Sequence, residues 1–121
     1  MDTTIAAFVR LAREVASADR ISYPPAELND LLTAASGPEI EALSLPEITD
    51  PYRLNYVTAM IELAAHRAGV LPPIWTTDVK PLDRPVFIDP SLKLRAHLLT
   101  ASPPPFRRRN SFIDSSLGDR V

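Results

Sequence analysis

The chain has 121 residues. This length suits one domain with one modest core, because a chain of this size buries roughly two-thirds of its unfolded surface. It contains no cysteine, which excludes a disulfide framework and any thiolate metal site. No stretch approaches the ~20 continuous apolar residues of a membrane span, and the first residues do not resemble a secretory signal. These features predict a soluble cytoplasmic protein without a membrane contact.

The net charge of −2 conceals an uneven distribution of charge along the chain. Residues 1–69 carry ten acidic and five basic side chains, a balance of −5, whereas residues 70–121 carry five acidic and eight basic ones, a balance of +3. Binding to duplex nucleic acid depends on neutralising phosphates, so an acidic first half disfavours it. The basic second half is the better candidate for contacts with a partner.

Residues 1–69 are expected to form a helical body, a small all-α bundle of about four helices. In the first, from residue 3 or 4 to about residue 19, apolar side chains recur every three or four positions, which is typical of a helix with one buried stripe. A second helix is expected to begin at Pro25, because proline suits a first helical turn. A short third helix is expected over residues 38–44.

The strongest helical pattern runs from Pro51 to about Ala68. Asp50 precedes a proline at the first helical position, and Gly69 followed by two prolines marks the end. Its apolar face is wide, which predicts that this helix lies at the centre of the bundle.

Residues 70–121 form the second predicted region, an extended Pro-rich arm. More than half of the 13 prolines of the chain lie here, so regular structure is expected to be sparse apart from one helix at about residues 90–101. Pro103 to Pro105 are expected to form a stiff polyproline strut. The arm is too apolar for a solvated linker, so we expect it to lie on the helical body, as one folding unit, or on a partner.

The end of the arm holds the candidate binding site. Three consecutive arginines follow the prolines, with Phe106 before them and Phe112 close behind. Arginine and aromatic side chains are enriched at the energetic centres of protein interfaces, where guanidinium groups pair with carboxylates and rings fill pockets. The predicted partner-binding residues are Trp75, Phe87, Phe106, Arg107, Arg108, Arg109, Asn110, Phe112 and Ile113.

Residues with catalytic or metal-binding patterns are scarce. His66 and His97 do not form a metal-binding pair, and the three glycines are too scattered for a phosphate-binding loop. No nucleophile, base and orienting residue can be grouped from the sequence. We therefore expect no enzymatic activity, no metal and no cofactor.

The arm also contains an ordered series of short motifs. They are Pro73-Ile74-Trp75, Pro85-Val86-Phe87, Leu94-Arg95, Leu98-Leu99, Ser102-Pro103, the stretch from Phe106 to Ile113, and Arg120-Val121. Over about residues 71–121 this order resembles small bacterial antitoxin-like proteins encoded beside nucleotidyltransferase-like toxins. The resemblance implies an antitoxin or accessory subunit whose arm binds its cognate toxin and covers the active-site cleft of that enzyme. The site of catalysis would then lie in the partner.

Two other classes of function stay open on the sequence, nucleic-acid binding and a structural role. Residues 25–44 could form a helix-turn-helix of a nucleic-acid-binding transcriptional regulator, although Glu39 and Glu41 are unfavourable in a recognition helix. The arginines could also contact RNA phosphates while a phenylalanine stacks on a base. A structural homodimer or scaffold, in which copies exchange the part of the arm around Trp75 and Phe87, is the other alternative.

Overall fold

A computed structural model of the chain describes residues 3–17, 24–87, 102 and 104–112, and these form an all-α fold as predicted. The helices are α1 (Thr3–Ser17), α2 (Pro24–Ala34), α3 (Gly37–Glu41), α4 (Pro51–Ala68) and α6 (Pro104–Arg108), with a 3₁₀ helix, η1 (Ile74–Asp78). Two strands of two residues each, β1 (Val86–Phe87) and β2 (Ser111–Phe112), form a parallel pair. None of the helices in these residues is both long enough and apolar enough to cross a membrane.

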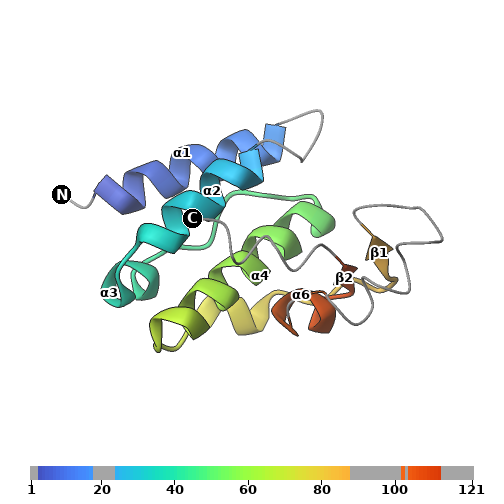
Figure 1. Ribbon diagram of the computed structural model, residues 1–121. Helices are drawn as coiled ribbons and strands as arrows, with labels where there is room; N and C mark the ends of the chain where they lie inside the picture. Colours follow the sequence, from blue (N-terminus) through green and yellow to red (C-terminus); the bar gives the residue numbers. More distant parts are fainter. Residues whose placement is uncertain (1–2, 18–23, 88–101, 103, 113–121) are drawn as a thin grey trace.

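Helix α4 is the central element of the fold, as the width of its apolar face predicts. Every residue from Asn55 to Ile61 is buried, which requires neighbours all around this part of the helix. In Figure 1, α1 and α2 lie on one side of α4, while η1 and α6 lie on the other. Gly69 ends the helix with a φ of 72°, a left-handed conformation that favours glycine.

The hydrophobic core is continuous across α4 and includes side chains from both halves of the chain. Phe8 of α1, Leu28 of α2 and Ile40 of α3 are buried in one hydrophobic cluster with side chains of α4, and Phe106 of α6 belongs to the same core. The described part of the arm therefore packs on the helical body.

Arg53 attaches α1 to the first turn of α4. Its Nη1 donates hydrogen bonds to the carbonyl oxygens of Val15 (2.8 Å) and Ala16 (3.1 Å) at the end of α1. The last carbonyls of a helix have no partner within it, and a guanidinium group there also matches the negative end of the helix dipole. This contact orients the first helix on the central one.

Helix α3 begins with a capping box. The Ser36 hydroxyl accepts from the backbone N–H of Glu39, and the Glu39 carboxylate accepts from the backbone N–H of Ser36 at 2.8 Å. The other carboxylate oxygen of Glu39 accepts from the hydroxyl of Thr4 in α1. Helix α3 is shorter than predicted and ends at Glu41, because the chain turns so that Leu43 enters the core.

Acid should weaken this junction between α1 and α3. The Thr4 hydroxyl first, and then the backbone and hydroxyl of Ser36, lower the pKa of Glu39 below its ordinary value. A carboxyl with a lowered pKa in the folded state stabilises the fold above its unfolded pKa, about 4.3 for glutamate, and loses that contribution as the pH falls through the folded value. Urea unfolding at pH 6 and at pH 3 should show a smaller acid loss for Glu39→Gln than for the wild type.

The matched control for this prediction is Glu41→Gln, which removes an exposed carboxylate from the same helix. This variant should keep the acid loss of the wild type. An equal acid loss in wild type and Glu39→Gln would show that the Glu39 contacts do not contribute to the pH dependence.

The arm differs from the predicted extended strut at its prolines. Pro104 and Pro105 begin α6 instead of continuing a polyproline segment, so that prediction is wrong for these two residues. Proline fits the first helical turn, where its missing N–H leaves no bond unmade. The helix expected at about residues 90–101 lies outside the described residues.

Candidate partner-binding site

The three consecutive arginines at the end of α6 differ in exposure. Phe106 and Arg109 are three residues apart and both are buried, whereas Arg107 and Arg108 between them are exposed. Arg109 directly follows the last residue of α6, and its N–H donates to the carbonyl of Phe106 at 3.1 Å, so the chain makes one more turn there. This turn leaves Arg107 and Arg108 exposed and Arg109 buried.

Phe106 anchors α6 to the central helix. Its side chain is 0% exposed, and its ring meets that of Tyr56 edge to face, with centroids 5.3 Å apart and an angle of 78° between the planes. Tyr52 extends this cluster from the preceding turn of α4, with its ring 6.0 Å from that of Tyr56. Burial, and secondarily the neighbouring Tyr52, raises the pKa of Tyr56, so its phenol stays neutral in this apolar setting.

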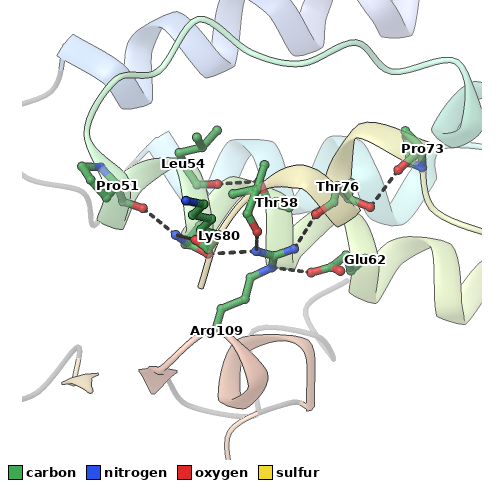
Figure 2. Close-up of polar contacts among 10 residues, drawn as sticks. Pro51, Leu54, Thr58, Glu62, Pro73, Thr76, Lys80 and Arg109 are labelled. Carbon is green, nitrogen blue, oxygen red and sulfur yellow. Dashed lines mark hydrogen bonds and ion pairs between the residues drawn. The ribbon is translucent and has the colours of Figure 1, made fainter. Parts of the chain in front are cut away.

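Arg109 is the polar anchor beside Phe106. Although charged, it is only 6% exposed. Its Nε donates to the Glu62 carboxylate at 2.6 Å, and Nη2 donates to the carbonyl of Thr76 at 2.8 Å, contacts that Figure 2 shows. Nη1 donates to Asn55 Oδ1 and to the carbonyl of Val79, both at 2.9 Å. A buried guanidinium group is tolerated only with such a set of acceptors.

Asn55 extends the Arg109 network into the chain that follows η1. While its Oδ1 accepts from Arg109, its Nδ2 donates to the carbonyls of Pro51 and Lys80, each at 2.9 Å. The hydroxyl of Thr76 donates to the carbonyl of Pro73 at 2.7 Å, and Figure 2 shows this bond beside the guanidinium group. The network thus joins α4, η1 and the segment after α6.

The backbone after Arg109 continues along the segment that follows η1. The carbonyl of Arg109 accepts from the N–H of Leu82 at 3.2 Å, and Asn110 Nδ2 donates to the carbonyl of Leu82 at 2.7 Å. Asn110 has a φ of 60°, a left-handed conformation that asparagine tolerates better than most residues. From there β2 pairs with β1, with Val86 opposite Ser111. These contacts fix the chain that follows α6, in addition to the packing of α6 itself on α4.

The nine predicted partner-binding residues do not form one exposed surface. Arg107 and Arg108 face solvent, while Phe106 and Arg109 contact the core of this chain and Asn110 is half-buried. Trp75 is also half-buried, and its indole N–H donates to the carbonyl of Leu43 at 2.9 Å. The backbones of Phe87 and Phe112 lie in β1 and β2, and Ile113 lies outside the described residues. The assignment of these residues to a partner stays a prediction.

Sequence reasoning missed the acceptors of Arg109. Asn55 and Glu62 are seven positions apart on α4, so they share one face of the helix, and Thr58 lies between them. A polar stripe on a helix with so wide an apolar face indicates a polar partner elsewhere in the chain. The polar stripe is visible in the sequence, but it does not identify which of the 13 basic residues binds there.

The comparisons with known proteins identify no relative of this chain. No protein-family model matches the chain, and neither a curated protein nor a solved structure is significantly similar to it. The resemblance to antitoxin-like proteins therefore stays a prediction. Within the part of the chain that the structure describes, no group of three histidine, aspartate or glutamate side chains is arranged to hold a metal ion.

Proposed function

We propose that this protein is a non-catalytic binding subunit that docks on an acidic surface of a protein partner through Arg107 and Arg108. The observation that supports the proposal is that the buried side chains of Phe106 in α6 and of Arg109 just after it hold the helix in place and leave the two intervening arginines exposed. Because the helix that carries them is held in place, Arg107 and Arg108 differ from a run of charges on a freely solvated segment.

A fixed helix favours binding because less freedom is lost on association. Long side chains that become immobile in an interface each cost about 0.5–1.5 kcal/mol, and a backbone that is already ordered adds little to this cost. Guanidinium groups bind carboxylates through paired hydrogen bonds, so the complementary surface would carry aspartate or glutamate. The acidic residues 1–69 favour such a protein partner over a phosphate backbone.

The resemblance stated for residues 71–121 supports a specific form of this proposal. In that form the partner is a nucleotidyltransferase-like toxin encoded beside this chain, and the protein is its antitoxin or accessory subunit. The two exposed arginines would meet carboxylates of the toxin that otherwise hold metal ions, and the arm would cover the cleft. The activity would then reside in the partner and its inhibition in this chain.

The test is co-expression of the full chain with the protein encoded beside it, followed by co-purification and a titration of affinity. The double variant Arg107→Glu/Arg108→Glu should bind that protein at least tenfold more weakly, since about 1.4 kcal/mol corresponds to a factor of ten. The matched control is Arg10→Glu/Arg13→Glu on α1, which changes the net charge equally at two exposed positions. It should bind like the wild type.

Three outcomes would contradict the proposal. The first is failure of the adjacent protein to co-purify with the wild-type chain. Equal losses in both double variants would assign the effect to the overall charge of the molecule. Salt-sensitive binding of a labelled RNA or of promoter DNA, abolished by Arg107→Glu/Arg108→Glu, would assign the arginines to a nucleic acid instead.

A further inference from the structure

An apolar pocket of about 370 Å³ lies between the start of α4 and η1. Its apolar lining includes Leu45, Pro51, Leu54 and Trp75. Asp78 and Lys80, both exposed, contribute one charge of each sign to the same lining. A pocket of this size accommodates a large apolar side chain, and the two charges beside it restrict which surface can approach.

The two most exposed large apolar side chains of the described residues come shortly before Trp75 in the sequence. Ile74 is 85% exposed and immediately precedes Trp75 in η1, and Leu71 is 82% exposed. Leu45, which lines the pocket, is itself 55% exposed. Exposed large apolar side chains and an apolar pocket that arise from the same segment of chain are typical of an interaction surface.

We propose that the occupant of this pocket is Ile74 of a second copy of this chain, in a two-fold symmetric dimer. The segment from Ile74 to Lys80 carries the exposed isoleucine, the Trp75 side of the pocket and two opposite charges two residues apart. A two-fold axis through this segment brings Asp78 of each copy opposite Lys80 of the other. Such a surface is self-complementary, because each contact occurs twice with the roles exchanged.

The dimer is independent of the function proposed for α6. No residue of α6 lines the pocket, so Arg107 and Arg108 stay outside the contacts that hold the two copies together. The variant Arg107→Glu/Arg108→Glu should therefore keep the mass of the wild-type dimer. Failure of the toxin-binding test and failure of the dimer test can thus be told apart.

Sedimentation velocity over a range of concentrations tests the apolar contact. The wild type should shift from monomer to dimer as its concentration rises, and Ile74→Glu should raise the dimer dissociation constant at least about tenfold. Because Ile74 is exposed, Ile74→Glu should fold like the wild type, and circular dichroism checks that both have the same helix content. Ala6→Glu, which adds the same charge at an exposed position of α1, is the control and should dimerise like the wild type.

Charge reversal tests the symmetry. Asp78→Lys and Lys80→Asp should each weaken the homodimer, because each places like charges opposite one another. An equimolar mixture of the two single variants should form a heterodimer, and the double variant Asp78→Lys/Lys80→Asp should dimerise again. A chain that is monomeric at every concentration, a dimer unaffected by Ile74→Glu, or charge reversals that mixing does not rescue would each overturn the proposal.

Discussion

Replacing Arg109 by alanine should lower the free energy of unfolding by about 3–5 kcal/mol, the range measured when one partner of a buried ion pair is removed. The substitution leaves the Glu62 carboxylate, which is largely buried, without its cation. It also removes the donors for Asn55 Oδ1 and for the carbonyls of Thr76 and Val79. Urea unfolding followed by the fluorescence of Trp75, the single tryptophan, measures the loss.

Two further variants separate the charge from its geometry. Arg109→Lys keeps the charge, but an ammonium group lacks the planar fork of donors that reaches acceptors on two elements. This variant should therefore be less stable than the wild type and more stable than Arg109→Ala. Arg109→Met/Glu62→Leu removes both charges and should also be more stable than Arg109→Ala, because no buried carboxylate is left unpaired. A change within about 0.5 kcal/mol for Arg109→Ala would show that the network contributes nothing measurable.

Replacing Phe106 by alanine should cost about 3–5 kcal/mol, as large-to-small substitutions of buried phenylalanine do. The ring is fully buried and packs edge to face on Tyr56, so its removal leaves a cavity between α6 and the central helix. Phe106→Leu retains most of the volume and should cost less than about 1.5 kcal/mol. The same urea titrations measure both values.

Partner binding distinguishes an internal anchor from a direct contact at this position. If Phe106 acts only by holding α6, Phe106→Leu should leave the affinity for the partner close to that of the wild type, whereas Phe106→Ala should reduce it by releasing the helix. A direct contact would make both variants bind more weakly at conditions where both are folded. Arg107→Ala is the control for stability, since an exposed arginine should change the unfolding free energy by less than about 0.5 kcal/mol.

The helices of the body could be predicted from local patterns. In α4, the proline at the first position and Gly69 at the end mark both boundaries, and the structure has the helix at Pro51–Ala68. Asp50 occupies the N-cap position, but its side chain makes no capping hydrogen bond. The same local rules were less successful at Pro104 and Pro105. Proline is compatible with a polyproline strut and with a first helical turn, and the burial of Phe106 is what favours the helix.

The amino-acid sequence by itself determined the all-α class, the central position of α4 and the basic, aromatic end of the arm, because these follow from periodicity, capping and composition. Only the tertiary structure decided which arginine of the triplet is buried. Three identical neighbours have the same local preferences, and the choice depends on acceptors at Glu62 and Asn55, 47 and 54 residues away in the chain. Long-range partners of this kind leave no local pattern at the residue they bind, so folding directs Arg109 inward and exposes Arg107 and Arg108.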